Sequence, residues 1–189
     1  MKKTLLVCAL ALISSWSYSQ SRYFTKNGKV HFDCTSPSSP ENIIGINDKV
    51  SSVIDVSTGE LEFAILMKAF SFEKALMQEH FNENYVESDK FPKATFKGTV
   101  SNMNIVNLSK DGSYPVKVIG LMTLHGVSKE ITSGGNLTVK GGSIVAANSD
   151  FKLVLADYGV TVPSLVKDKV ASEAKISIDL VYQSMAKRE

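Results

Sequence analysis

The sequence predicts an all-β domain of antiparallel strands with one short helix, and three observations support this fold class. Most of the 189 residues fall into segments where apolar and polar residues alternate with a period of two, as in strands with two different faces. Short Gly-containing turn signals, such as those at residues 57–59, 110–112 and 140–142, separate these segments. The long helical connections that a parallel sheet requires do not occur between them.

Eight segments carry the strand pattern. The clearest lies near the C-terminus, where Ala174, Ile176 and Ile178 share one face while Lys175 and Ser177 point the other way. Similar alternation recurs along the chain. Strands are therefore expected over residues 30–34, 50–56, 61–67, 94–100, 116–124, 130–139, 143–155 and 174–183.

One helix is expected, over residues 72–81. Ser71 is its expected N-cap, and Glu73 lies in its first turn, where a carboxylate interacts favourably with the helix dipole. We expect the apolar residues of this helix to pack against the sheet: Phe72, Ala75, Leu76, Met77 and Phe81.

Strands with one apolar face must bury that face. A sandwich does so by stacking two sheets, and a barrel does so by closing one sheet on itself. Periodicity does not distinguish these two architectures. If the strands form an eight-stranded barrel, its interior is either packed with side chains or holds one small or slender ligand.

The first 19 residues have the layout of a secretory signal peptide. Lys2 and Lys3 form a basic start, residues 5–13 are an unbroken apolar run, and Ser17 and Ser19 are the small residues before a cleavage site. The run is much shorter than the roughly 20 residues of a membrane-spanning helix. We therefore expect cleavage after Ser19 and a single domain of residues 20–189, periplasmic or secreted, with no transmembrane segment.

Charge and cysteine content exclude further classes of protein. The chain has 21 Lys and Arg against 19 Asp and Glu, and loss of Lys2 and Lys3 leaves 19 of each in the mature domain. Nucleic-acid binding depends on basic surfaces, so no nucleic-acid partner is expected. Because Cys8 leaves with the signal peptide, Cys34 has no intramolecular partner, and its alternation with Phe32 indicates a buried thiol.

The common catalytic signatures are missing from the sequence, which has no phosphate-binding Gly-rich loop, nucleophile elbow, HExxH or CxxC motif. Its histidines, His31, His80 and His125, lie far apart. A composite site of His80, Glu83 and His125 is the one arrangement that would support catalysis or metal binding, and nothing in the spacing favours it. We expect no catalytic residues, no metal site and no cofactor other than a bound lipid or quinone.

Two longer motifs carry a family resemblance. Residues 75–98, which read ALMQEHFNENYVESDKFPKATFKG, resemble the short helix, ES-x-x-FP stretch and following strand of the YceI-like family of bacterial secreted proteins. Residues 121–131, LMTLHGVSKEI, are similar to that family's strand and HG-V-S-K turn. With the flanking strands, the resemblance covers residues 22–183. The segment 22–47 and the stretch 150–153 depart from the family pattern, which leaves the head-group contacts of a ligand open.

The resemblance implies a lipocalin-like, antiparallel eight-stranded barrel with one short helix, and it favours the barrel over the sandwich. It also implies an isoprenoid lipid partner, held inside the barrel by its polyprenyl chain. Large apolar residues on alternating strand positions are the candidate lipid-binding residues: Phe63, Ile65, Met67, Phe96, Met122 and Ile178. The oligomeric state is left open, with a homodimer as one alternative.

Three functions follow from these features. The leading hypothesis is a non-enzymatic periplasmic carrier that holds a quinone tail or polyprenyl chain in an apolar barrel. The second is a packed barrel without a cavity that serves as an interaction module of the cell envelope. The third is an enzyme that acts on a lipid head group or a quinone through His80, Glu83 and His125.

Overall fold

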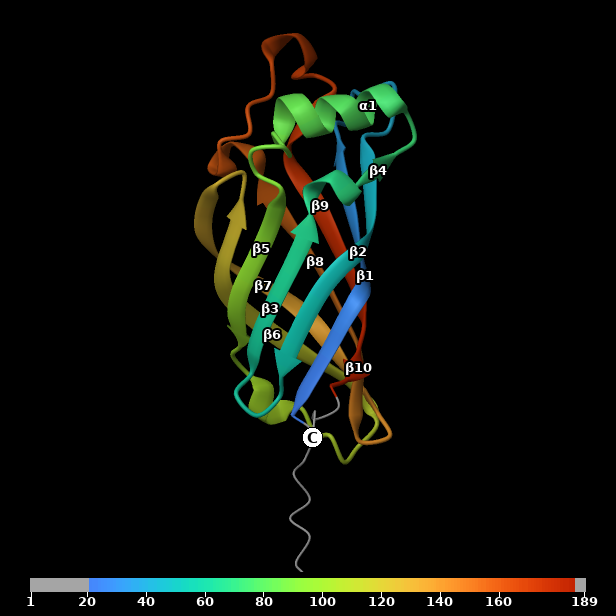
Figure 1. Cartoon of the computed structure of the whole chain (residues 1–189), viewed down its shortest axis with the longest axis vertical. Helices are drawn as coiled ribbons and strands as arrows, with labels where there is room; N and C mark the ends of the chain where they lie inside the picture. Colours follow the sequence, from blue (N-terminus) through green and yellow to red (C-terminus); the bar gives the residue numbers. More distant parts are fainter. Residues whose placement is uncertain (1–20, 186–189) are drawn as a thin grey trace, which may run out of the picture.

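The computed structural model describes residues 21–185, so the expected signal peptide lies outside the described residues. Eight long strands form one elongated barrel (Figure 1). Their bounds are β1 (Arg22–Thr35), β2 (Ile44–Asp55), β3 (Glu60–Leu66), β5 (Lys93–Val100), β6 (Gly112–Leu124), β7 (Val127–Lys140), β8 (Ser143–Val154) and β9 (Val170–Val181). Two short strands, β4 (Ser71–Phe72) and β10 (Gln183–Ser184), extend the sheet at β2 and β1.

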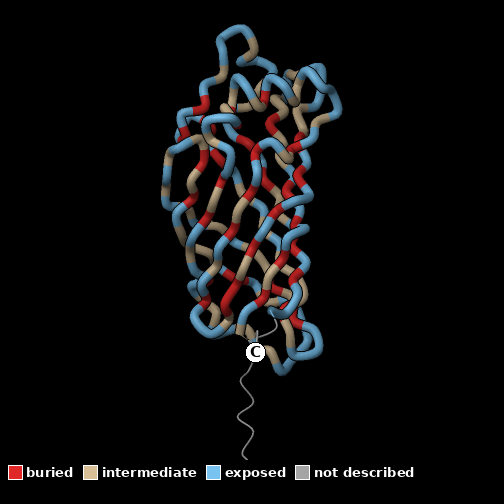
Figure 2. Tube along the Cα trace, viewed as in Figure 1, coloured by how far each residue is buried: buried red, intermediate tan, exposed pale blue. Residues whose placement is uncertain are grey.

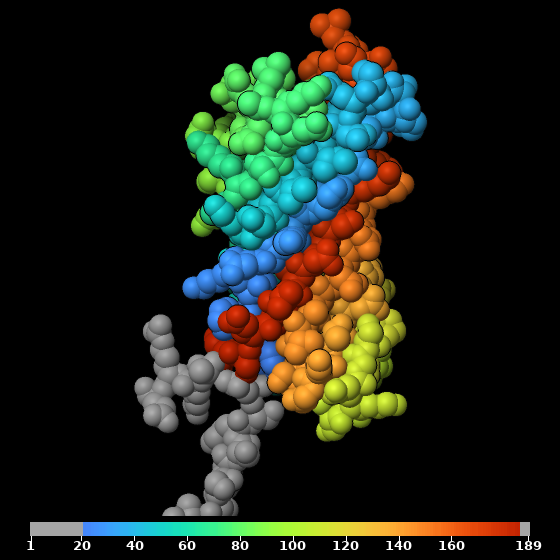
Figure 3. Space-filling view, turned by 90° about the vertical axis from the view of Figure 1, so that its right-hand side faces the viewer, coloured from blue at the N-terminus to red at the C-terminus, as the bar shows by residue number. Residues whose placement is uncertain are grey.

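The strands follow an up-and-down order. Each long strand pairs antiparallel with the next long strand in sequence, and β1 pairs with β9 to close the ring. Figure 3 shows β1 in blue beside β9 in red along this closure. The expected eight-stranded antiparallel barrel is therefore confirmed. In the ring every long strand has a neighbour on both sides, which limits the unpaired strand edge that can lead to aggregation, although parts of β2, β7 and β8 lack a ladder partner on one side.

Alternation of side chains places one face of each strand inside the barrel. In β9, for example, Ala174, Ile176 and Leu180 are buried while Lys175 and Val181 are exposed. Figure 2 shows buried positions interrupting exposed ones along the strands. All eight segments expected to be strands are strands, and β1 and β2 extend well beyond the short segments that the sequence pattern indicates.

The helix is shorter than expected and begins later. Helix α1 covers Ala75–His80 and continues into a π-helical turn, η2 (Phe81–Tyr85). The expected start at Phe72 with Ser71 as N-cap is wrong because both residues form β4 against the free edge of β2, where the Ser71 hydroxyl donates to the Ile46 carbonyl at 3.1 Å. Pairing with β2 satisfies backbone groups that a helix start would leave without partners.

The expected packing of α1 against the sheet is also wrong. The helix lies across one end of the barrel rather than on a face of the sheet (Figure 1). As a result, Leu76 is 60% exposed, and only Phe81, in the π-helical turn, is buried among the apolar residues expected on this face. None of the helices in the described chain is long and apolar enough to cross a membrane.

The two ends of the barrel differ. The α1 end carries the long connections, including η1 (Met67–Ala69), η4 (Leu155–Tyr158) and η5 (Ser164–Val166). The opposite end has the short β2–β3 and β7–β8 turns and η3 (Met103–Ile105). The wall of the barrel is also uneven: β6 and β7 pair along their whole length, whereas β7 and β8 pair only over residues 135–140 and 143–149.

Candidate functional site

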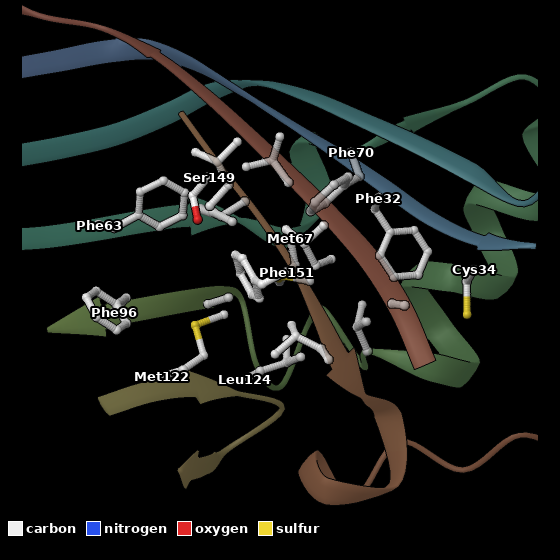
Figure 4. Close-up of a pocket in the computed structure, with 18 of the residues that line it drawn as sticks. Phe32, Cys34, Phe63, Met67, Phe70, Phe96, Met122, Leu124, Ser149 and Phe151 are labelled. Atoms are coloured by element: carbon white, nitrogen blue, oxygen red, sulfur yellow. The ribbon is translucent and has the colours of Figure 1, made fainter. Parts of the chain in front are cut away.

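A cavity of about 490 Å³ occupies the barrel interior, and every one of the eight long strands contributes to its lining. Such a volume is typical of small-molecule sites. Most of the lining side chains are apolar, and several of them converge in the close-up of Figure 4. The barrel is therefore hollow rather than filled by its own side chains.

All six candidate lipid-binding residues line this cavity: Phe63, Ile65, Met67, Phe96, Met122 and Ile178. Phe63, Phe96 and Met122 form a row across β3, β5 and β6, because Phe63 is the register partner of Phe96 and Phe96 that of Met122. Figure 4 shows these three side chains on one side of the cavity. A lipid at this row would contact only carbon and sulfur.

Four phenylalanines gather at the α1 end of the cavity. The ring of Phe81 lies 4.9 Å from that of Phe72, 5.3 Å from Phe70 and 5.7 Å from Phe32, measured between centroids. The contacts with Phe70 and Phe32 are edge-to-face, a favourable geometry for aromatic pairs. The four rings line the cavity beneath α1, so this element positions an aromatic end wall.

Charged groups stand beside these rings at the same end. Lys74 and Glu41 form an ion pair, and both line the cavity. The hydrogen bond between them raises the pKa of Lys74 and lowers that of Glu41, so both groups are charged at neutral pH. His80 and Lys169 also reach the lining here.

Two further polar groups in the cavity lining, the Tyr182 hydroxyl and the Cys34 thiol, are buried. The Tyr182 hydroxyl lies 2.8 Å from the Ser52 hydroxyl, and burial raises the pKa of Tyr182 to about 12. Near the α1 end, the Cys34 thiol donates to the Ala171 carbonyl at 3.1 Å, and burial raises its pKa to about 11. A thiol that stays protonated is a poor nucleophile, which agrees with the buried thiol expected at this position.

The sequence interpretation did not find a polar stretch in the wall between β7 and β8. Ser133, Asn136, Asn148 and Ser149 all line the cavity there, and Figure 4 shows the Ser149 hydroxyl turned toward its apolar residues. The signal was present, because Ser133 and Gly135 on β7 and Ser149 on β8 interrupt an inward series that is otherwise apolar.

The residues of the enzyme hypothesis are not brought together. His125 Nε2 bonds to Glu87 Oε2 at 2.7 Å rather than to Glu83, and its Nδ1 bonds to the Tyr158 carbonyl at 3.0 Å. His80 Nδ1 lies 3.0 Å from the Asn84 amide, and Glu83 lines a separate, shallow hollow outside the barrel. Within residues 21–185, no group of three His, Cys, Asp or Glu side chains is placed to hold a metal ion.

The two sequence motifs meet at one structural junction. His125 and Gly126 form the tight β6–β7 turn with φ of 51° and 76°, both in the left-handed region. A Cβ on Gly126 would lie 2.5 Å from the Phe91 ring, which in turn stacks edge-to-face on His125 at 4.7 Å. The motif therefore fixes the entry to β5 and holds η4 through His125 and Tyr158.

The barrel, its hollow interior and this junction agree with a comparison with known families. The family model described as the YceI-like domain matches residues 23–182. The chain belongs to the YceI-like family. Both motifs of this YceI-like protein lie at the junction between α1, β5 and the β6–β7 turn, where they organise the α1 end of the cavity.

Solved structures share the fold at low sequence identity. A polyisoprenoid-binding domain from Saccharophagus degradans implicated in plant cell wall breakdown has a TM-score of 0.73 and 15% identity, with 88% of this chain and 99% of that chain covered. BcnA of Burkholderia cenocepacia has a TM-score of 0.62 and 14% identity over 82% and 96% of the two chains. A YceI protein of Campylobacter jejuni has a TM-score of 0.56 and 17% identity, with 78% of this chain and 87% of that chain covered. No curated protein matches the sequence.

Proposed function

We propose that this YceI-like protein is a carrier that holds the polyprenyl chain of an isoprenoid lipid or quinone inside its barrel. The single observation that carries the proposal is the apolar cavity of about 490 Å³ lined by all eight strands. Family membership and the polyisoprenoid-binding neighbour from Saccharophagus degradans support a lipid as its occupant. The signal-peptide pattern of residues 1–19 supports a periplasmic or secreted carrier.

The chemistry of the lining suits a long hydrocarbon. The row formed by Phe63, Phe96 and Met122 offers no hydrogen bond, so it favours a ligand that gains affinity from burial alone. At about 25 cal/mol per Å² of apolar surface, a chain that buries about 300 Å² gains roughly 7.5 kcal/mol before the costs of binding. Each further isoprene unit adds to this sum until the cavity is full.

The alternatives have less support. The cavity argues against a packed barrel that serves only as an interaction module. The enzyme hypothesis needs His80, Glu83 and His125 to converge, yet His125 is held by Glu87 and the Tyr158 carbonyl. The proposal therefore assigns no catalytic residue and treats Phe63, Ile65, Met67, Phe96, Met122 and Ile178 as lipid contacts.

A chain-length series tests the carrier function. Polyprenols of two to eight isoprene units would be titrated into the mature protein while displacement of a fluorescent apolar dye is measured. We expect affinity to rise by about tenfold or more for each of the first added units and then to level off, because further units no longer enter the barrel. Equal affinity for all lengths, or no displacement, would overturn the proposal.

A further inference from the structure

The barrel wall is interrupted between β7 and β8. Residues 127–134 of β7 pair only with β6, and residues 150–154 of β8 pair only with β9. The shared ladder stops at the Gly135–Ser149 pair. Toward the α1 end the strands are bridged again by η4, through an ion pair between Lys129 Nζ and Asp157 Oδ1 at 2.8 Å. A gap bounded at both ends therefore lies in the wall.

The cavity reaches this gap. Ile131 on β7 and Phe151 on β8 both line the cavity, yet both are only half-buried. Asn148, at the end of the shared ladder, also lines the cavity although it is exposed. A Cβ built on Gly134 would meet nothing within 4 Å. The cavity lining therefore extends to residues that solvent also reaches, and no side chain covers Gly134 from outside the barrel.

Hydrogen-bonding groups cluster at the end of the gap where the ladder shared by β7 and β8 stops. Ser149 Oγ donates to the Gly134 carbonyl at 2.7 Å and lies 2.8 Å from Ser133 Oγ. Asn136 Nδ2 donates to Asn148 Oδ1 at 3.0 Å. These bonds leave the Asn148 amide nitrogen as a donor and the Asn136 amide oxygen as an acceptor with no partner among the described residues. Ser133 Oγ also donates to the Gly134 carbonyl, at 3.1 Å, so each serine hydroxyl donates to a ligand only by turning away from the groups it now contacts. The Asn148 amide is thus the free donor of the cluster, and the serine and Asn136 oxygens keep lone pairs to accept.

The charges around the gap disfavour an anionic ligand. Lys129 is paired with Asp157, and Lys152 is paired with Glu173 at 3.2 Å. The other ionisable residues of the two unpaired segments are acids, Glu130 and Asp150, and both are exposed. On the flanking strands, Lys117 of β6 is the register partner of Gly134 and Asp179 of β9 is that of Asn148, so these two charges balance. A phosphate or diphosphate would therefore still meet net negative charge at the gap, whereas an uncharged polar group would not.

We propose that the β7–β8 gap is a lateral opening of the cavity that holds the polar end of its ligand, and that this end is an uncharged hydrogen-bonding group such as a quinone carbonyl, an alcohol or an amide. The inference rests on the proposed carrier function. It assigns Ser133, Ser149 and Asn148 as the specificity-determining residues, while the apolar chain extends into the barrel.

Matched ligands test this assignment. The binding of a decyl-tailed benzoquinone and of decylbenzene, which has the same tail and no hydrogen-bonding group, would be measured for the native protein and for Ser133→Ala/Ser149→Ala. Asn148→Leu serves as a second variant, because its exposed side chain can be replaced without loss of packing. Ser177→Ala is the control, since Ser177 lies on β9 beside the gap and does not line the cavity.

We expect both variants to bind the quinone about tenfold more weakly and to bind decylbenzene within twofold of the native protein, with Ser177→Ala unchanged for both ligands. Unchanged quinone binding in the variants, with decylbenzene still bound, would overturn the lateral site and leave the carrier function standing. Tighter binding of farnesyl diphosphate than of farnesol would also overturn it. Binding of neither decyl ligand to the native protein would overturn both proposals.

Discussion

The two walls of the cavity are built differently. The wall formed by β3, β5 and β6, the apolar wall, is paired without interruption where it faces the cavity, and it presents Phe63, Phe96 and Met122. The wall formed by β7 and β8, the interrupted wall, is paired over only half of each strand and presents Ser133 and Ser149. One wall suits the length of a hydrocarbon chain, and the other suits the chemistry of its end.

Glycines mark the same contrast. On the apolar wall, Gly98 and Gly120 face one another across the ladder, and the Phe96 ring packs over both of them. On the interrupted wall, Gly134 stands in open space just beyond the last pair. The first arrangement uses missing side chains to seat an aromatic ring, and the second leaves the gap unfilled. The contrast leads to four predictions.

The largest expected difference between the two walls is the loss of ligand affinity when one aspartate is introduced into each wall. We expect Phe96→Asp to lower affinity for the hydrocarbon and the quinone at least about 100-fold, because the carboxylate would be buried among apolar groups. Ser149→Asp should cost about tenfold or less, because a carboxylate at the proposed lateral opening would remain in contact with solvent. Binding would be measured by dye displacement, with circular dichroism to check folding. Lys97→Asp, on the outer face of β5, is the control, and equal losses in the two walls would contradict the comparison.

Adding a methyl group to the apolar wall should cost more stability than adding one to the gap. A Cβ on Gly120 would lie 2.4 Å from the Gly98 Cα and the Lys97 carbonyl oxygen, both backbone atoms. We expect Gly120→Ala to lower the free energy of unfolding by about 2–3 kcal/mol. Urea denaturation measures the change. A cost below about 0.5 kcal/mol would show that the walls do not differ in this way.

Neighbouring glycines on β7 should respond in opposite directions. A Cβ on Gly135 would lie 2.4 Å from the Asn148 carbonyl oxygen, whereas Gly134 has no neighbour within 4 Å. We expect Gly135→Ala to destabilise the protein by about 1–2 kcal/mol. Gly134→Ala should be neutral or slightly stabilising, by up to about 0.5 kcal/mol, because it restricts the unfolded chain. Urea denaturation measures both changes in the free energy of unfolding. Similar changes for the two variants would contradict an end of the β7–β8 ladder at Gly135.

The last prediction concerns the loss of stability at low pH, which we assign to an ion pair that lies outside both walls. The Arg22 guanidinium, which donates to Asp55 at 2.8 Å, and the Ser57 hydroxyl hold the pKa of the Asp55 carboxyl at about 2. Because this pKa is about 3.9 in an unfolded chain, the stabilisation is complete above pH 4 and is lost as the pH falls toward 2.

Asp55→Asn should therefore remove part of the acid sensitivity of the unfolding free energy. Arg22 is largely exposed, so we expect a difference below about 2 kcal/mol between pH 5 and pH 2.5. Asp48→Asn, which removes an exposed carboxylate from the same strand, is the control for the loss of one negative charge. If the unfolding free energy of Asp55→Asn depends on pH as that of the native protein does, the Arg22–Asp55 ion pair does not cause the acid sensitivity.

The alternation of apolar and polar residues predicted the strands and their inward side chains. It did not predict where strands pair at their ends, as the position of β4 shows. The period of two located all eight strands, and choosing large apolar residues at alternate positions found six side chains that line the cavity. Family resemblance supplied the choice of a barrel. The helix start was wrong because Ser71 has the residue type of an N-cap, yet the free edge of β2 offered it a strand partner.

The alternation pattern does not predict the gap between β7 and β8. Where pairing stops depends on how two strands diverge around the ring, and no residue of β7 or β8 alone determines this. Ser133 and Ser149 interrupt the apolar inward positions of β7 and β8, and only the register of Gly135 with Ser149 shows that this interruption coincides with the end of the ladder.

Native mass spectrometry of the protein, purified without detergent from a bacterium that produces it, tests the central claim most directly. The proposed carrier function predicts one isoprenoid lipid or quinone bound per chain, identified by solvent extraction and mass analysis, and absent from Phe96→Asp. A clean mass of the protein alone, unchanged after incubation with quinones and polyprenyl lipids, would contradict the carrier function and favour a barrel that serves as an interaction module.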